Sequence, residues 1–312
     1  MLDECRTAVL DLCGRRPYVC SMQTIRLAFS PDADDWFMFQ PLIRGKVVAD
    51  GLRFVHESVE TEALNARTEA ADSPDVCAVS IAHVPTIADR YLLLPHGGSV
   101  GRGYGPIVVA RAPMGLTDLA DRRVAVPGLR TTAHLVLSLL LDRACPGRVY
   151  APVVVPITPY ARVFGALAAG EVDAALLIHE GRLSWSDDPS LHAVIEIGEA
   201  WASWTGLPLP LGGNVIRRDL GPEVIEAVSR ACRASIEWSL AHRDEAIDAL
   251  LASGVRDEAA GLSRARLDRY LGMYANADSA GYDTETVRAI EVLLGKARAA
   301  GLAPGRAVEW AP

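Results

Sequence analysis

Short apolar runs alternate with longer amphipathic segments over much of this chain, and this alternation restricts the fold more than any other feature. We predict strands at 25–29, 52–56, 75–79, 122–128, 149–155 and 173–178, and helices at 34–43, 60–70, 131–143 and 160–169. Strands that alternate with helices at this spacing form βαβ units, in which helices cover both faces of a mixed, mostly parallel sheet. The chain is therefore predicted to have an α/β fold.

The predicted strands fall into two blocks, and a third block near the C-terminus is almost entirely helical, with helices at 219–241, 244–251, 263–274 and 284–300. Two extended segments, 106–111 and 209–218, lie where one block gives way to the next. We expect two lobes with a ligand cleft between them. Lobe one would comprise 24–110 and 214–312, and lobe two would be the insertion 111–213.

Composition favours a small molecule as the partner. The 312 residues carry a net charge of −8 without any long run of like charges, so nothing favours nucleic acid or an anionic membrane surface. Apolar runs stay shorter than the roughly 18 residues that a membrane span needs. The six cysteines show no C-x-x-C pair and no Cys/His ligand spacing, so we predict no metal site.

The N-terminus lacks the pattern of an export signal. Asp3, Glu4 and Asp11 lie where a signal peptide needs basic and then uninterrupted apolar residues. Met22 directly precedes the first convincing strand, so we expect residues 1–23 to form a disordered extension. These features predict a cytoplasmic protein.

Polar segments at the ends of predicted strands are the first candidates for a binding site, because α/β folds bind ligands there. Ser30 is followed by Asp32, Asp34 and Asp35. Asp32 or Asp34 can cap the following helix, or the Ser30 hydroxyl and the helix N-terminus can face the cleft. We include Ser30 and Asp35 among the candidate substrate contacts.

The same pattern recurs at the third strand and in lobe two. Ser80 ends the third strand, and Thr131 and Thr132 open a helix. Each can be a simple N-cap, or its hydroxyl can join free backbone N–H groups in binding a carboxylate or phosphate. Both lobes therefore direct hydroxyl-capped helix N-termini toward one predicted cleft.

The segment 101–106 is too rich in glycine for a regular element. No helix follows it, so it does not fit a dinucleotide fingerprint. Arg102 is a candidate partner for a substrate carboxylate, or else a solvated loop arginine. Gly103 permits a close approach of the backbone to a ligand or to the other lobe. Asn214, in the second crossover segment, is a further candidate.

His179 is the candidate general base. It follows the apolar run 173–178, which is typical of a buried strand, so it would leave the sheet at the carboxyl end. Imidazole titrates near neutral pH, as a group that removes protons requires. A structural histidine is the alternative. Glu180 is able to orient the ring, although adjacent side chains rarely face each other.

Taken in order, six segments resemble the 1,4-dihydroxy-6-naphthoate synthases of the futalosine route to menaquinone. They are Ser-Pro-Asp-Ala-Asp-Asp-Trp-Phe-Met-Phe (30–39), Asp-Val-Cys-Ala-Val-Ser (75–80), Gly-Arg-Gly-Tyr-Gly-Pro (101–106), Thr-Thr-Ala (131–133), Leu-Ile-His-Glu-Gly (177–181) and Leu-Pro-Leu-Gly-Gly-Asn (209–214). The resemblance covers about residues 24–305. It implies a type II periplasmic-binding-protein-like fold used as a cytoplasmic carbon–carbon lyase.

The resemblance also implies a reaction and a set of roles. The family cleaves cyclic dehypoxanthine futalosine, a carboxylate, to 1,4-dihydroxy-6-naphthoate and dihydroxyacetone without a metal or organic cofactor. Its proton acceptor falls on His179, which we expect to be neutral when it removes a proton. Its substrate contacts fall on a strand-end serine segment and a threonine pair, here Ala78, Val79, Ser80, Thr131 and Thr132.

One departure from the family changes the charge of the expected site. Many members have Cys-Pro-Asn-Asp where this chain has Asp32-Ala33-Asp34-Asp35, which adds negative charge near a carboxylate substrate. Two alternative functions share the expected fold. One is a sister enzyme that dehydrates chorismate, and the other is a solute-binding protein that performs no chemistry and would require export.

Overall fold

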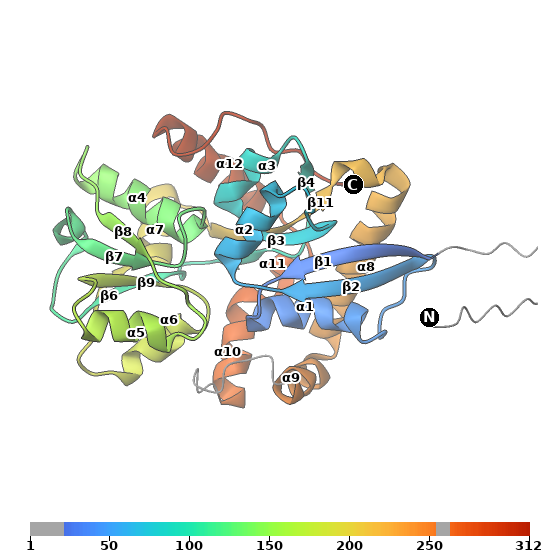
Figure 1. Ribbon diagram of the computed structural model, residues 1–312, viewed down its shortest axis with the longest axis horizontal. Helices are drawn as coiled ribbons and strands as arrows, with labels where there is room; N and C mark the ends of the chain where they lie inside the picture. Colours follow the sequence, from blue (N-terminus) through green and yellow to red (C-terminus); the bar gives the residue numbers. More distant parts are fainter. Residues whose placement is uncertain (1–21, 254–262) are drawn as a thin grey trace, which may run out of the picture.

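The computed structural model describes residues 22–253 and 263–312, which form two α/β lobes (Figure 1). The sheet of lobe one has the strand order β2-β1-β3-β11-β4, with β5 also paired to β11. Its strands are β1 (Gln23–Phe29), β2 (Leu52–Ser58), β3 (Val76–Ser80), β4 (Tyr91–Leu93), β5 (Ser99–Gly101) and β11 (Leu209–Arg217). β1 is parallel to β2 and β3, whereas β11 is antiparallel to its three neighbours.

The sheet of lobe two has the strand order β10-β6-β9-β7-β8. Its strands are β6 (Ile107–Ala110), β7 (Arg123–Val126), β8 (Ala151–Val154), β9 (Ala174–Leu177) and β10 (His192–Glu196). β7 is parallel to β8 and β9, whereas β6 is antiparallel to β9 and β10. Both sheets are mixed, and their parallel content is lower than we predict because β6 and β11 run against the βαβ units beside them.

The chain changes sheets a few residues earlier than the boundaries we predict at 110 and 213. Strand β6 pairs with β9 and β10, so 107–110 already belong to lobe two. Strand β11 pairs with β5 from Leu209 onward, so 209–213 belong to lobe one. Apolar content identifies an extended segment but not the sheet that it joins. The predicted extension 1–23 lies outside the described residues apart from its last two, and Gln23 begins β1.

Helices cover the sheets of both lobes. Those of lobe one are α1 (Ala33–Ile43), α2 (Thr61–Glu69), α3 (Val84–Ile87), α8 (Pro222–Ala241), α9 (Arg243–Ala252), α10 (Arg264–Tyr274), α11 (Ala277–Ala280) and α12 (Thr284–Ala299). Those of lobe two are α4 (Thr132–Ala144), α5 (Ala161–Ala168), α6 (Gly181–Ser184) and α7 (Ile197–Thr205). Ser235 and Ser239 of α8 each donate a hydrogen bond of 2.6 Å to a backbone carbonyl of α1. The C-terminal helices therefore pack onto lobe one (Figure 1).

Trp201 of α7 is one of the largest fully buried side chains of the described residues. Its indole Nε1–H donates to the Pro208 carbonyl at 2.9 Å. We expect Trp201→Ala to lower the free energy of unfolding by about 3–5 kcal/mol, because the lost burial adds to the cost of the cavity. Trp201→Phe retains most of the ring contacts and should lose less. Denaturant unfolding followed by circular dichroism measures both losses, and equal losses would contradict this explanation.

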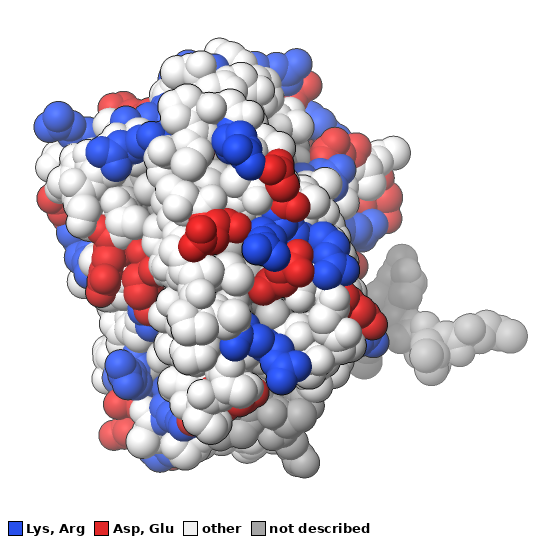
Figure 2. Space-filling model, turned by 90° about the vertical axis from the view of Figure 1, so that its left-hand side faces the viewer, with Lys and Arg blue, Asp and Glu red and all other residues white. Residues whose placement is uncertain are grey.

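The surface of lobe two carries both signs of charge. Figure 2 shows Lys and Arg side chains interspersed with Asp and Glu side chains on this face. Within lobe two, Arg123 and Asp173 form an ion pair at 3.1 Å. The visible face therefore has no extended field of one sign. Among the described helices, none combines the length and the apolar character that crossing a bilayer requires.

Candidate functional site

A cavity lies between the lobes and brings together most of the residues proposed from the sequence. Its lining includes nine of them, from both lobes: Ser30, Asp35, Ala78, Val79, Ser80, Thr131, Thr132, His179 and Asn214. The strand ends and helix starts that contribute them converge because the carboxyl edges of the two sheets face the same cleft.

His179 reaches the cavity through an unusual backbone turn. Strand β9 ends at Leu177, and His179 then adopts a φ of +48°, in the left-handed region that residues other than glycine rarely occupy. The Tyr160 hydroxyl donates to the Ile178 carbonyl just before this turn. Strained backbone of this kind is concentrated at functional sites, because the surrounding structure must hold it in place.

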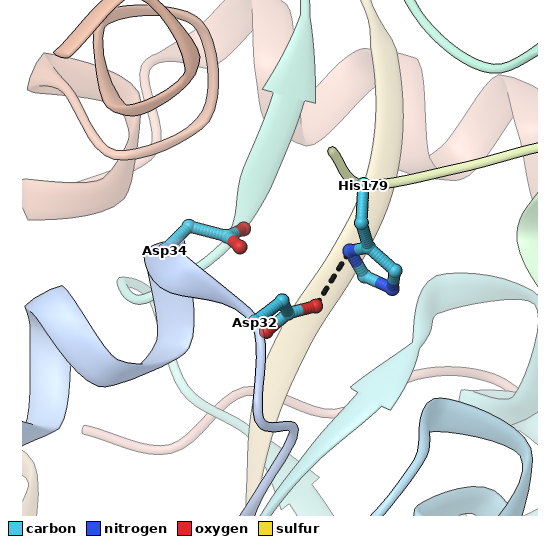
Figure 3. A group of neighbouring side chains, drawn as sticks. All are labelled: Asp32, Asp34 and His179. Atoms are coloured by element: carbon cyan, nitrogen blue, oxygen red, sulfur yellow. Dashed lines mark ion pairs between the residues drawn. The ribbon is translucent and has the colours of Figure 1, made fainter. Parts of the chain in front are cut away.

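The imidazole ring is held by three side chains. Its Nδ1 lies 2.5 Å from a carboxylate oxygen of Asp32, and its Nε2 lies 3.1 Å from the Thr61 hydroxyl. The Tyr270 hydroxyl is 3.4 Å from Nδ1. Figure 3 shows His179 descending from its loop toward Asp32 at the start of α1. A carboxylate at Nδ1 keeps the proton on that nitrogen, so Nε2 is the atom left to exchange protons.

Burial and mutual electrostatic effects change the pKa values of His179 and of the carboxylates around it. Burial would lower the pKa of His179, but the Asp32 carboxylate outweighs it and, with Asp34 and Glu180 nearby, raises the pKa to about 10. Burial and the charge of Asp32 raise the pKa of Asp34 to about 7. In the free protein at neutral pH, His179 and Asp32 therefore form an imidazolium–carboxylate pair, so the ring must lose a proton before it acts as a base.

The aspartates after Ser30 do not cap α1, contrary to the capping interpretation. Asp32 occupies the N-cap position but makes no capping hydrogen bond, because its carboxylate contacts His179. The N–H of Ala33 instead donates to Glu180 of lobe two at 3.1 Å, so Glu180 is directed at α1. Asp34 accepts hydrogen bonds from the hydroxyls of Ser99 (2.6 Å) and Tyr270 (2.8 Å).

Hydroxyls at the start of α4 are largely engaged within the protein. Thr131 is the N-cap of α4, and its hydroxyl donates to the Gly128 carbonyl at 2.8 Å. The Thr132 hydroxyl donates to the Leu211 carbonyl at 2.6 Å. The Ser80 hydroxyl accepts from Asn65 at 3.2 Å, which leaves its own proton available. Thr132 and Ala133 line the cavity in the first turn of α4, where backbone N–H groups lack helical acceptors.

Arg102 and Gly103 are not among the residues that line the cavity, and this corrects our expectation for both. The Arg102 guanidinium instead pairs with three carboxylates at the C-terminal end of lobe one, those of Asp278, Asp283 and Glu285. Gly103, with a φ of +78°, has open space where a side chain would lie. Gly103 therefore lies in an open turn, whereas Tyr104 and Gly105 of the same loop lie against Gly198 of lobe two.

Sequence reasoning missed several residues of the site. Thr61 begins α2, and Tyr270 and Tyr274 lie in α10, yet all three line the cavity. A threonine at a helix start was a detectable signal. The tyrosines lie in a helix with ordinary amphipathic spacing, which gives no signal that its apolar face meets a cleft. Asn214 is buried, and its amide donates to the Gly97 carbonyl at 3.1 Å.

Asp32, Asp34 and His179 are residue types that bind metals, and one potential ligand atom of each lies within 4.8 Å of the other two. However, a shared cation would hold a nitrogen and an oxygen each at about 2.0–2.2 Å and so about 3 Å apart. Asp32 and His179 are 2.5 Å apart, in direct contact. The arrangement is that of an ion pair, and we assign no metal to it.

Comparison with known proteins places the chain in a family. The family model described as menaquinone biosynthesis matches residues 25–299. A relative from Thermus thermophilus, named 1,4-dihydroxy-6-naphtoate synthase, is 40% identical over 284 residues, which cover 90% of this chain and 97% of the relative. The chain belongs to the menaquinone-biosynthesis family. A Streptomyces coelicolor protein of this family and of the same name is 36% identical over 91% of this chain and 96% of its own length.

Solved structures confirm the fold expected for this member of the menaquinone-biosynthesis family. A crystal structure of an Archaeoglobus fulgidus protein has a TM-score of 0.78 and 38% identity, and the match covers 89% of this chain and 98% of the other. The alkanesulfonate-binding protein SsuA from Xanthomonas axonopodis has a TM-score of 0.64 at 16% identity, with 91% and 96% covered. At that identity the likeness concerns the periplasmic-binding-protein fold alone.

Proposed function

We propose that this protein is a 1,4-dihydroxy-6-naphthoate synthase, a carbon–carbon lyase that cleaves cyclic dehypoxanthine futalosine to 1,4-dihydroxy-6-naphthoate and dihydroxyacetone. The relatives from Thermus thermophilus and Streptomyces coelicolor carry this enzyme's name. The observation that carries the proposal is the position of His179, which lies in the interlobe cavity with Nδ1 held by Asp32 and Nε2 beside Thr61.

In the proposed reaction, Nε2 of His179, once neutral, removes a proton from the bound ring system and so starts carbon–carbon cleavage and aromatisation. The proton on Nδ1 stays with Asp32, whose carboxylate stabilises the imidazolium that forms. The proton on Nε2 then passes to the leaving three-carbon fragment, which returns the ring to the neutral form that began the reaction. As in the family resemblance, the proposal includes no cofactor.

Negative charge on the substrate needs hydrogen-bond donors, and both lobes contribute donors to this cavity. Ser80 offers a hydroxyl proton, and the first turn of α4 offers the backbone N–H groups of Thr132 and Ala133. The lining contains no lysine or arginine among the described residues. We assign the substrate carboxylate, or the oxygen that becomes negative during cleavage, to these donors.

Ser80→Ala tests this assignment. A hydrogen bond to a charged group contributes about 1.5–3 kcal/mol, so we expect the KM for the cyclic substrate to rise about tenfold or more. Ser190→Ala, which removes a hydroxyl bonded only to nearby Asp188, is the matched control and should leave KM unchanged. Steady-state kinetics measure both variants. An unchanged KM in Ser80→Ala would place the negative group elsewhere.

A turnover assay tests the function itself. The purified protein is given cyclic dehypoxanthine futalosine or chorismate, and the products are identified by mass spectrometry. We expect naphthoate and dihydroxyacetone from the first compound and no reaction of the second. Conversion of chorismate would show the sister activity, and binding without turnover would show a solute-binding protein. Cell fractionation tests the cytoplasmic location that we propose.

A further inference from the structure

The ring of His179 belongs to lobe two, but the side chains that contact its nitrogens belong to lobe one. Asp32 lies at the start of α1, Thr61 at the start of α2, and Tyr270 in α10. All three of these contacts cross the cleft, and from lobe two Glu180 adds the effect of its charge on the ring. The surroundings of the ring therefore depend on how the two lobes lie relative to each other.

We propose that Asp32 and Thr61 are positioning residues for His179, and that the catalytic ring acquires its working tautomer only when the two lobes close. The proposal rests on the proposed function, in which Nε2 of His179 exchanges the proton. Its physical content is that Asp32 holds the proton on Nδ1, while the Thr61 hydroxyl fixes the plane of the ring through Nε2 until the substrate takes its place at that nitrogen. Asp32 is buried, so its carboxylate has little access to water as an alternative partner.

Separation of the lobes would remove both contacts at once. A neutral imidazole without fixed partners is a mixture of its two tautomers, and in one of them Nε2 carries the proton and cannot accept another. His179 would also be free to change its ring rotamer, because the atoms that hold it would move away with lobe one. An open enzyme would therefore keep its histidine but lose the arrangement that makes it a base.

Contacts at the rim of the cleft hold the closed arrangement described here. Arg130 of lobe two pairs with Glu62 and Glu69 of α2, each at 2.9 Å. Arg266 of α10 pairs with Asp187 of lobe two at 2.5 Å. These side chains are partly exposed and do not line the cavity. They therefore allow closure to be changed without touching the ring or its partners.

The first experiment observes the ring directly. The two nitrogens of His179 are assigned by long-range ¹H–¹⁵N NMR at about pH 11, above the pKa of about 10, so that the ring is neutral and its tautomer is observed. The variant His179→Asn identifies the missing signals. We expect Asp32→Asn and Thr61→Val each to move both nitrogen shifts of His179, and Thr61→Ser, which retains the hydroxyl, to restore them. Unchanged shifts in Asp32→Asn and Thr61→Val would overturn the proposal.

The second experiment changes closure from a distance. Arg130→Ala removes both ion pairs to α2, and Arg230→Ala is the matched control, because Arg230 pairs only within α8. We expect Arg130→Ala to increase the radius of gyration in solution scattering, to shift the His179 nitrogens toward those of Asp32→Asn, and to lower kcat/KM about threefold to tenfold. Arg230→Ala should change none of these.

The outcomes separate this inference from the proposed function. A larger radius of gyration with unchanged His179 shifts would overturn the coupling between closure and ring position. If Arg130→Ala leaves the radius of gyration unchanged, the double variant that also carries Arg266→Ala is measured. Unchanged His179 nitrogen shifts in this double variant would also overturn the coupling. The NMR experiment needs no substrate. Absence of turnover with the cyclic compound would therefore contradict the proposed function, but the NMR shifts would still test the positioning of His179.

Discussion

His179→Asn is expected to lower kcat for the cyclic substrate by at least about a hundredfold, up to about ten thousandfold, with little change in ligand affinity. This is the contribution that a positioned proton-transfer group makes to a rate. Asparagine can keep a hydrogen bond to Asp32 or Thr61 but cannot accept a proton at neutral pH. Because the donors at Ser80 and α4 are untouched, binding of the product 1,4-dihydroxy-6-naphthoate should remain.

Single-turnover kinetics and calorimetric titration with the product measure the two quantities separately. His192→Asn is the matched control, because His192 is an exposed residue of β10 that does not line the cavity, and this variant should retain full activity. Full activity in His179→Asn would remove the base from our mechanism. A loss of product affinity as large as the loss of rate would show that the substitution disturbs the cavity. His179 would then have no specific role in proton transfer.

The second large effect concerns the pH dependence. Histidine acts as a base in its neutral form, and the surroundings raise the pKa of His179 to about 10. We therefore expect kcat/KM to rise about tenfold for each pH unit until the pH reaches about 10. In Asp32→Asn the largest raising influence is removed, while Asp34 and Glu180 remain nearby. The rise of kcat/KM with pH should therefore occur at lower pH in this variant, closer to the ordinary pKa of histidine.

Rates measured from pH 6 to pH 10.5 on both proteins test this expectation. The maximal rate of Asp32→Asn should also be lower, because an amide stabilises the imidazolium less than a carboxylate does. At pH 7 these effects oppose each other, so the comparison requires whole profiles. A rise over the same pH range in the two proteins would show that Asp32 does not set the protonation of His179.

The strands that build the site could be predicted because each is a buried apolar run with a polar residue at its end. The runs ending at Ser80 and before His179 are examples. Strands β4 and β5 have three residues each, too few for a periodic signal, and β10 is half exposed. Arg102 was misplaced because its partners, such as Asp278, lie far along the chain.

The least predictable part of the site is the contact that matters most to it. Asp32 at a helix start has a sufficient local explanation as a cap, and nothing in its neighbourhood points to His179. Their contact depends on how two lobes lie, and local patterns carry no information about that arrangement. The sequence allows Glu180 to orient the ring of His179, but its carboxylate is directed at the start of α1, where it accepts from the N–H of Ala33.

Two reciprocal contacts join the turn after β9 to the start of α1. Asp32 of the first lobe holds His179, and Glu180 of the second accepts the N–H of Ala33. For protein engineering the two segments therefore form one module. A chimera that takes 30–35 from a relative and keeps 178–181 from this chain would separate residues that depend on each other, whereas exchanging both together preserves the pairing.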